Sequence, residues 1–352
     1  MNTTFTYAQG SLQLQRWPLN QPNTSLQAWD AADELLIQHT FDAAAQFKVQ
    51  HQRAPLLLII NDCFGALSCA LAEFEQIQIN DSVLAEHGTR HNRLQNNLGL
   101  SGLKQLSSLD AYPNQPDIVL LKLPNNHSYL QFILQQLAKV ASADSVILAS
   151  AKAKDINRNV LAMFNATLGP ASASLTVKKC RLIQCQVVAD LPATTLVQFP
   201  LRWPLENSSY TLVNHANVFS REKLDQGARF FLQHLPEIEA GQTIIDLGCG
   251  NGVLGLPVLS QGKAIQLLFC DESYMAVASA QQTIAENLPQ QLAQCQFIAD
   301  DCLSLQADRS ADIVLCNPPF HQQQAVTSHI ASQMFLDAKR VLKQGGRLRI
   351  VA

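Results

Sequence analysis

The chain has 352 residues, 47% of them hydrophobic and 15% charged, and its formal net charge is −3 at pH 7. This length and composition predict two well-cored globular domains, and no apolar run is long enough to cross a bilayer. The first residues lack a basic segment followed by an apolar core, so a secretory signal is not expected. The nine cysteines form no C-x-x-C pair. We therefore expect a cytoplasmic protein with reduced thiols and no metal site.

The first half of the chain, residues 1–190, is predicted to form an α/β domain. The continuous apolar run 56–60, followed by a turn and a small-residue helix at 67–74, is typical of a buried parallel strand that opens such a unit. The elements alternate and end in a β-rich hairpin, which predicts a doubly wound sheet with an antiparallel edge. They are an alternating run at 11–15, an amphipathic helix at 26–37, strands at 77–79, 117–121 and 146–149, a helix at 155–168, and β-rich runs at 172–177 and 181–188.

The second domain is predicted at residues 191–352, after a connector at about 190–205 that contains three prolines. Ser220 is the expected N-cap of a helix that ends at Leu232. The pattern of strand, turn and helix then restarts, with a polar residue directly after most strands. The predicted elements are a short strand at 210–213, strands at 243–245, 267–270, 296–299, 313–316 and 348–351, and helices that end at about Leu259 and span 330–341.

An internal repeat relates the two halves, because three stretches match in the same order. The matches are Asp117 with Asp312, Ile59–Asn61 with Ile244–Asp246, and Asp81 with Asp271. The first copy differs at the positions expected to carry chemistry. There, Cys63, Ala66 and Leu67 stand about where Gly248, Asn251 and Gly252 stand, and Lys122 and Asn125 replace Asn317 and Phe320. The sequence therefore predicts two tandem Rossmann-like copies of one fold, the first degenerate and the second catalytic.

The second copy is shorter than the first. Its last predicted strand, 348–351, matches 146–149, after which the first copy continues through a helix and two strands. We therefore expect the second sheet to stop after its fifth strand, either because the sequence is a fragment of a longer chain or because the domain is built on a shortened sheet.

A glycine-rich turn follows the first strand of the second copy, in the pattern Asp246-x-Gly248-x-Gly250-x-Gly252. Glycine lets the backbone approach a ligand closely, so these four residues are predicted to bind a cofactor. Gly255 follows Gly252 at the dinucleotide spacing, so a nicotinamide cofactor is an alternative. Asp246 favours S-adenosylmethionine, because a carboxylate suits a cationic methionine group and repels a pyrophosphate.

Two aspartates after later strands extend the predicted cofactor site. Asp271 can accept hydrogen bonds from ribose hydroxyls, a role common to both cofactors. Asp301 can accept from an adenine amine, and Asp300 is the less favoured residue of that pair.

The predicted catalytic motif is Asn317-Pro318-Pro319-Phe320, which follows an apolar strand. Each proline fixes its own φ, and the first pushes Asn317 toward an extended conformation. The Asn317 oxygen and the Pro318 carbonyl could hold both hydrogens of a planar amine, with Phe320 stacked on the ring and Asn317 also bordering the cofactor. Catalysis would then be positioning for an in-line displacement, without a strong general base. A proline-stiffened loop that binds no ligand is the structural alternative.

Four parts of the sequence carry a resemblance to a known family: Leu26–Glu34, Asn61–Asp62 with Phe64–Glu73, His215–Arg221, and Asn317–Gln323. The second half resembles class I S-adenosylmethionine-dependent methyltransferases of the N-P-P-F/Y amino-methylating group. The whole chain resembles the bacterial ribosomal RNA guanine-N2 methyltransferases with a duplicated fold. Within that family it is more similar to the large-subunit (23S) enzymes than to the small-subunit enzymes.

The resemblance implies a cytoplasmic enzyme that methylates N2 of one guanine in 23S ribosomal RNA, and we expect a monomer whose first domain helps to hold the RNA. Two basic clusters then become candidate phosphate contacts. They are Lys152, Lys154 and Arg158, and Lys178, Lys179 and Arg181, while Phe320 and His321 are expected beside the target base. That base must leave its stack, which favours a loop or junction guanine.

Two other functions stay open from the sequence. The Asn-Pro-Pro-Phe motif suits any planar amine, so adenine N6 or a protein glutamine amide is an alternative acceptor. A non-catalytic RNA-binding or assembly factor is the alternative outside the enzymes, if the shortened sheet cannot hold a cofactor. Failure to bind S-adenosylmethionine would exclude both enzyme functions.

Overall fold

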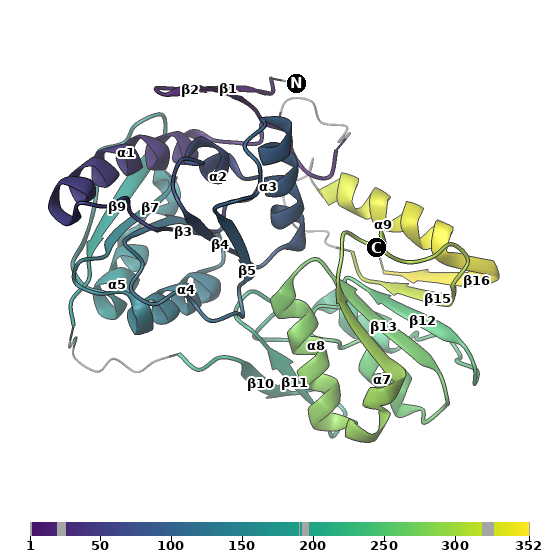
Figure 1. The fold of residues 1–352 in the computed structure, drawn as a ribbon. Helices are drawn as coiled ribbons and strands as arrows, with labels where there is room; N and C mark the ends of the chain where they lie inside the picture. Colours follow the sequence, from purple (N-terminus) through teal and green to yellow (C-terminus); the bar gives the residue numbers. More distant parts are fainter. Residues whose placement is uncertain (1, 20–25, 190, 192–196, 319–326, 352) are drawn as a thin grey trace. The chain divides into compact units, whose positions relative to one another are not determined.

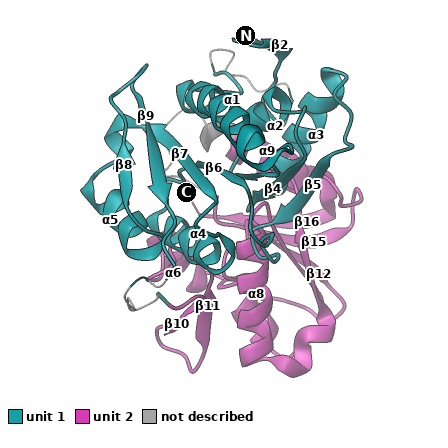
Figure 2. Cartoon of the chain, turned by 60° about the vertical axis from the view of Figure 1, so that its left-hand side comes forward, with its two compact units in different colours: residues 1–197 teal, residues 198–352 magenta. Residues whose placement is uncertain are grey.

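The computed structural model describes residues 2–19, 26–189, 191, 197–318 and 327–351. The chain divides into two compact units, Met1–Val197 and Gln198–Ala352, each with its own large sheet (Figure 2). Among the described helices, none is both long enough and apolar enough to pass through a membrane.

Unit 1 contains a seven-stranded sheet with the order β5-β4-β3-β6-β7-β9-β8 (Figure 1). The first five strands run parallel, and β9 is antiparallel to β7 and β8, so the predicted antiparallel edge is confirmed. The elements are β1 Thr4–Tyr7, β2 Gly10–Gln13, α1 Ala31–His51, β3 Leu57–Ile60, α2 Ala66–Ala70, β4 Gln76–Asn80, α3 Val83–Gln95, β5 Leu103–Ser107, β6 Ile118–Lys122, α4 His127–Val140, β7 Val146–Lys152, the 3-10 helix η1 Ala153–Asp155, α5 Arg158–Thr167, β8 Ala171–Ala173 and β9 Cys180–Gln186.

Helix α1 begins later and extends further than the predicted helix at 26–37, so both predicted ends are wrong. Asp30 has an extended backbone with φ −138°, and its carboxylate accepts hydrogen bonds from the backbone N–H groups of Ala32 and Asp33. In return, the Asp33 side chain accepts from the Asp30 N–H. This capping box sets the first turn of the helix.

Unit 2 contains a five-stranded parallel sheet with the order β14-β13-β12-β15-β16, and a separate antiparallel pair, β10 with β11. The elements are β10 Leu201–Pro204, β11 Thr211–Asn214, α6 Gln226–Leu232, β12 Thr243–Leu247, α7 Gly255–Ser260, β13 Gln266–Asp271, α8 Tyr274–Asn287, the 3-10 helix η2 Pro289–Gln294, β14 Cys295–Ala299, β15 Ala311–Cys316, α9 Thr327–Val341 and β16 Leu342–Ile350.

Two predictions at the start of unit 2 need correction. The division between the units falls within the predicted connector at 190–205, but its last residues form β10, which pairs along its whole length with β11. Ser220 does not cap α6: its φ is +53°, and its hydroxyl donates to the Lys223 carbonyl. The cap is Asp225, whose carboxylate accepts from the Ala228 N–H at 3.1 Å. Carboxylate and hydroxyl side chains both make good caps, so composition alone did not separate the two positions.

The two sheets have the same topology, which confirms the internal repeat. Strands β14, β13, β12, β15 and β16 occur in the order of β5, β4, β3, β6 and β7, and no described strand of unit 2 corresponds to β9 or β8. The repeat extends to single hydrogen bonds. Asp117 accepts from the Leu56 N–H, and Asp312 accepts from the Thr243 N–H, both at 2.8 Å.

These bonds show that the predicted match between the first strands of the two copies is wrong by two residues. Leu57 pairs with Ile118 as Ile244 pairs with Ile313, so Leu57 corresponds to Ile244. Asn61 therefore occupies the place of Gly248, and not that of Asp246. By the same registers, Asn80 rather than Asp81 corresponds to Asp271.

The corrected register shows that the first copy keeps one glycine of the turn. Gly65 corresponds to Gly252, and both have φ +79°. A Cβ atom on Gly65 would lie 2.7 Å from the Cα of Thr89, and one on Gly252 would lie 3.1 Å from the Cα of Ala280. This glycine is required for packing between turn and helix in both copies, so its presence does not indicate a ligand.

Candidate active site

The predicted site residues of unit 2 follow parallel strands and therefore meet at one edge of the sheet. Leu247 of β12 pairs with Cys316 of β15, so Gly248 and Asn317 are the next residues on neighbouring strands. Asp271 ends β13, which pairs with β12 on its other side. Carboxyl ends of strands beside a change in strand order are where open α/β sheets bind ligands.

The glycine turn has an open part and a packed part. Gly248 and Gly250 have φ values of +71° and +53°, which favour glycine. Among the described residues, no atom lies within 4 Å of a Cβ placed on Gly250, whereas one on Gly248 would meet the methyl of Met334 at 3.1 Å. The open backbone at Gly250 is where a ligand could approach closely, whereas Gly248 is packed against the Met334 side chain.

Asp246 is a buried carboxylate with one oxygen available. It is 1% exposed, and its Oδ2 accepts from the Gly255 N–H at 3.0 Å. Its Oδ1 is buried and has no hydrogen-bond partner among the described residues. Burial, with a smaller contribution from Asp271, raises the pKa of Asp246 to about 8. Such an oxygen would be stabilised by a cationic or hydrogen-donating ligand.

Asp271 supports the turn from the next strand. Its Oδ2 accepts from the Gly250 N–H and its Oδ1 from the Ser273 N–H, both at 3.0 Å. Asp271 thus fixes the backbone of the turn at Gly250 from the end of the neighbouring strand.

The two aspartates after β14, Asp300 and Asp301, differ in burial and in their hydrogen bonds. Asp300 is 1% exposed and accepts from the Ser304 hydroxyl at 2.6 Å and from the Leu305 N–H at 2.9 Å. Asp301 is only partly buried, and burial with its acidic neighbours raises its pKa to about 6. Asp300 holds its own loop, so Asp301 is the better candidate for a ligand contact.

Asn317 is held by a residue that sequence reasoning placed in no functional role. Its Nδ2 donates to Oδ2 of Asp225, the cap of α6, at 3.2 Å. Pro318 is buried, while Pro319, Phe320 and His321 lie outside the described residues. The only sequence signal for Asp225 was its suitability as a helix cap.

Lys122 takes the place of Asn317 in unit 1, as the repeat predicted. It ends β6 as Asn317 follows β15, with Leu121 and Cys316 as the paired residues before them. Its ammonium lies 2.8 Å from Asp33 Oδ2 and 3.2 Å from Asp30 Oδ1. An ion cluster between Lys122 and the start of α1 thus lies at this edge of the unit 1 sheet, where Asn317 of unit 2 is bonded to Asp225.

The structure brings the two predicted basic clusters of unit 1 together. Lys152 at the end of β7 pairs with Cys180 at the start of β9, and the Ala153 N–H donates to the Lys179 carbonyl at 2.8 Å. The exposed members of the joined set are Lys152, Lys154, Arg158, Lys178 and Lys179.

Two of the predicted basic residues already have protein partners. The guanidinium of Arg181 donates to the backbone carbonyls of Ser174 and Ala173, at 2.7 and 3.2 Å. Lys178 forms an ion pair with Glu34. Arg181 therefore holds the loop after β8. In the predicted contact with an RNA phosphate, its guanidinium would have to serve both the phosphate and these two carbonyls.

Comparison with known proteins places the chain in a family. It matches the descriptions "RLMG N-terminal domain" over residues 2–189 and "Methyltransferase small domain" over residues 209–352. Ribosomal RNA large subunit methyltransferase G of Pseudoalteromonas translucida (strain TAC 125) is 45% identical over 340 residues, which cover 96% of this chain and 86% of that protein. The protein of the same name from Yersinia enterocolitica is 44% identical over 341 residues, covering 97% and 84%. The chain belongs to the ribosomal RNA large subunit methyltransferase G family.

A solved structure shares the fold of this methyltransferase G family member over both units. It is a T. Thermophilus 16S rRNA N2 methyltransferase (RsmC) in complex with AdoMet and guanosine, with a TM-score of 0.71 and 20% identity. The match covers 99% of this chain and 86% of the other. At that identity the likeness shows the tandem Rossmann-like fold alone.

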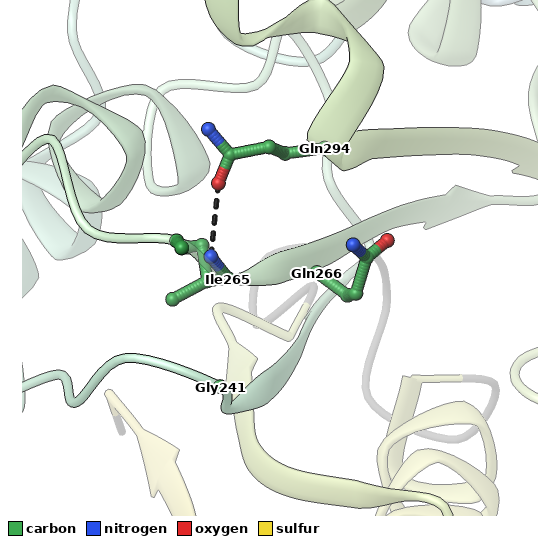
Figure 3. A pocket seen from close by; sticks show the side chains of 5 residues that line it. Gly241, Ile265, Gln266 and Gln294 are labelled. Carbon is green, nitrogen blue, oxygen red and sulfur yellow. Dashed lines mark hydrogen bonds between the residues drawn. The ribbon is translucent and has the colours of Figure 1, made fainter.

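One surface pocket of this chain lies away from the predicted site residues of unit 2. It is lined by Gly241, Ala264, Ile265, Gln266 and Gln294, before or at the start of their strands (Figure 3). The Gln294 oxygen accepts from the Ile265 N–H at 2.9 Å. This pocket lies at the amino edge of the sheet, opposite the glycine turn, and carries none of the predicted chemistry.

In the described parts of the chain, no group of three or more His, Cys, Asp or Glu side chains is arranged to hold a metal ion.

Proposed function

We propose that this chain is an S-adenosylmethionine-dependent methyltransferase that methylates the exocyclic N2 amine of one guanine in 23S ribosomal RNA. The observation that carries the proposal is the placement of Asn317 one residue beyond β15, beside the Gly248 turn. Asn317 therefore follows the strand next to the one that leads into a cofactor-type turn, in a chain of the methyltransferase G family. We further propose that it works in the cytoplasm as a single chain on ribosomal RNA.

The residues at the sheet edge fit S-adenosylmethionine. The buried Oδ1 of Asp246 has no partner among the described residues, and the cationic methionine part of the cofactor would supply one. Gly248 and Gly250 would let the backbone lie against the cofactor, Asp271 would accept from the ribose, and Asp301 would accept from the adenine amine. When bound, the cofactor supplies an electrophilic methyl group on a sulfonium sulfur.

The protein's contribution to the reaction is positioning. The lone pair of a guanine N2 amine is delocalised into the ring, so the amine is a poor nucleophile. The oxygen of Asn317 and the carbonyl of Pro318 would accept the two N2 hydrogens and direct the nitrogen lone pair toward the methyl group. Phe320 would stack on the base. Fixed acceptors of this kind stabilise the positive charge that develops on the amine during transfer.

The deciding experiment is transfer of labelled methyl from S-adenosylmethionine to ribosomal RNA, followed by digestion to nucleosides. We expect N2-methylguanosine from 23S RNA and none from 16S RNA. Parallel reactions with protein-free RNA and with assembled subunits identify the form that is modified. A labelled adenine, or label in protein only, would overturn the assignment of the acceptor, and a chain that fails to bind the cofactor would overturn the enzyme assignment.

Replacement of Asp246 by Asn is expected to stabilise the cofactor-free protein and weaken cofactor binding. The raised pKa means that the folded chain keeps a proton that the unfolded chain releases, so stability falls as the pH rises from about 4 to about 8. A neutral amide removes that loss, and we expect a gain of roughly 2–4 °C in Tm at pH 8 that shrinks toward pH 4. Affinity for S-adenosylmethionine should fall about 10- to 100-fold, because a charged partner is lost.

Thermal melts across this pH range and calorimetric titration with the cofactor measure both effects. Asp300→Asn is the matched control, because Asp300 is equally buried but bonded within its own loop. Equal loss of cofactor affinity in both variants would contradict the assignment of Asp246.

We propose that the joined basic residues of unit 1 contact RNA phosphates, and the turn between Val177 and Cys180 offers a test. These two residues exchange two backbone hydrogen bonds of 2.8 Å around Lys178 and Lys179, whose φ values are +47° and +67°. Two left-handed residues in such a turn favour Asn-Gly, so lysines here are unfavourable for the fold.

The double substitution Lys178→Asn/Lys179→Gly is therefore expected to preserve or raise stability while weakening RNA binding. The slope of log K against log salt should fall in magnitude by about 1–2, as two phosphate contacts are lost. Filter binding at several salt concentrations measures the slope. Lys104→Gln/Lys139→Gln removes the same charge from exposed positions elsewhere in unit 1. Equal slopes for the two double variants would contradict the proposed surface.

A further inference from the structure

Asp225 has two hydrogen-bond donors on one carboxylate oxygen. Its Oδ2 accepts from the Ala228 N–H at 3.1 Å and from Asn317 Nδ2 at 3.2 Å. The first bond caps helix α6. The second joins residues 92 positions apart in the chain and reaches the residue proposed to hold the target amine.

The chemistry of this contact fixes which way the Asn317 amide faces. An ionised carboxylate only accepts hydrogen bonds, so it binds the NH₂ end of the amide and not the oxygen end. If the amide turned over, Asn317 Oδ1 would face Asp225 Oδ2, and two acceptors would repel each other. The orientation matters because an exocyclic amine donates its hydrogens, and only the oxygen end of Asn317 can accept one.

Gly227 provides the space in which these groups meet. A Cβ atom on Gly227 would lie 2.9 Å from Asp225 Oδ2 and 3.0 Å from Asn317 Oδ1. It would also lie 3.3 Å from a methyl carbon of Val351. The backbone of Gly227 has no left-handed φ, so this glycine is explained by the close approach of the side chains and not by its conformation.

We infer that Asp225 is a positioning residue for methyl transfer, which holds the Asn317 amide with its oxygen available to the acceptor amine. Gly227 is the companion residue that admits this contact. The inference rests on the proposed function, because it assigns Asp225 a role through Asn317. A helix cap alone would not require it, since serine caps helices about as well as aspartate.

Two substitutions of Asp225 separate positioning from capping. Asp225→Ser keeps a cap but is too short to reach Asn317, and we expect kcat to fall by up to about 100-fold. Asp225→Asn keeps a carbonyl oxygen at the same place for both donors, and kcat should stay within about threefold of the wild type. In both variants the Tm and the calorimetric affinity for S-adenosylmethionine should match those of the wild type.

A third substitution tests the contact from the other side. Gly227→Ala adds a methyl group between the two side chains and should lower kcat while Asp225 itself is unchanged. A preserved kcat in Asp225→Ser would overturn the inference. Equal losses of kcat in Asp225→Ser and Asp225→Asn, together with a lower Tm, would also overturn it, because they would indicate a role in folding.

Methyl transfer by the wild type distinguishes a failure of this inference from a failure of the proposed function. If the wild type transfers no methyl group to ribosomal RNA, the proposed function fails. If the wild type forms N2-methylguanosine and Asp225→Ser does so at the same rate, the proposed function stands and only the positioning role of Asp225 fails.

Discussion

Replacing Asn317 with Ala is expected to slow methyl transfer to ribosomal RNA by at least about 100-fold and to leave S-adenosylmethionine binding nearly intact. The substitution removes the oxygen that would hold the target amine. It leaves the turn at Gly248 and Gly250 and the carboxylate of Asp246 unchanged. Single-turnover transfer of labelled methyl and calorimetric titration with the cofactor measure the two quantities separately.

Asn317→Asp is a second substitution, which tests the orientation of the side chain. It keeps an oxygen on the side facing the acceptor but places a second carboxylate oxygen against Asp225, where Nδ2 now donates at 3.2 Å. Repulsion between the two carboxylates should turn the side chain away, so transfer should also fall. Loss of cofactor binding in Asn317→Ala would contradict the role given to Asn317 and would assign that residue to the cofactor instead.

The topology of both sheets could be predicted because each buried strand is a short apolar run that ends at a polar residue. Asp271 and Asn317 marked two such ends in unit 2, and both lie at the predicted edge. Boundaries set by local hydrogen bonds were predicted less well. Helix α1 depends on the capping box at Asp30, and β10 depends on pairing with β11, so neither follows from hydrophobic periodicity.

The register of the repeat shows a second limit of sequence reasoning. Apolar strand residues are interchangeable, so a shift of two positions keeps every side chain on the same face of the strand. The equivalent residues are identified by hydrogen bonds of the folded chain, such as those from the Asn61 N–H to the Ile79 carbonyl and from the Gly248 N–H to the Cys270 carbonyl. The contact between Asp225 and Asn317 was unpredictable for a related reason, because nothing in either local sequence indicates the other.

The same position of the two copies has different surroundings. In unit 2, Asn317 is a neutral side chain whose Nδ2 donates to Asp225. In unit 1, Lys122 is a charged side chain with 15% of its surface exposed, paired with Asp33, which is 1% exposed. Burial raises the pKa of Asp33 to about 7 despite the opposing effect of Lys122. The carboxylates of Asp33 and Asp30 outweigh burial and raise the pKa of Lys122, so the ammonium remains protonated.

Replacing Lys122 with Met should therefore destabilise unit 1 without changing the chemistry of unit 2. Removing one partner of a buried pair leaves an uncompensated charge and costs about 3–5 kcal/mol. The loss of stability should be larger above pH 7 than below it. Without Lys122, Asp33 must either be buried as a carboxylate or bind a proton, and a proton becomes harder to bind as the pH rises. Hydrogen exchange of unit 1 amides at pH 6 and pH 8 measures the loss of stability.

The double variant Lys122→Met/Asp33→Asn is the control that identifies the charge as the cause. The asparagine introduced by the second substitution has no charge and keeps an oxygen that can accept from the Asp30 N–H, so the capping box survives and most of the stability should return. Cofactor affinity, measured by calorimetry, should equal that of the wild type in both variants. A loss of stability that is independent of pH, or that the second substitution does not reverse, would show that Lys122 acts through packing of its aliphatic chain and not through its ion pairs.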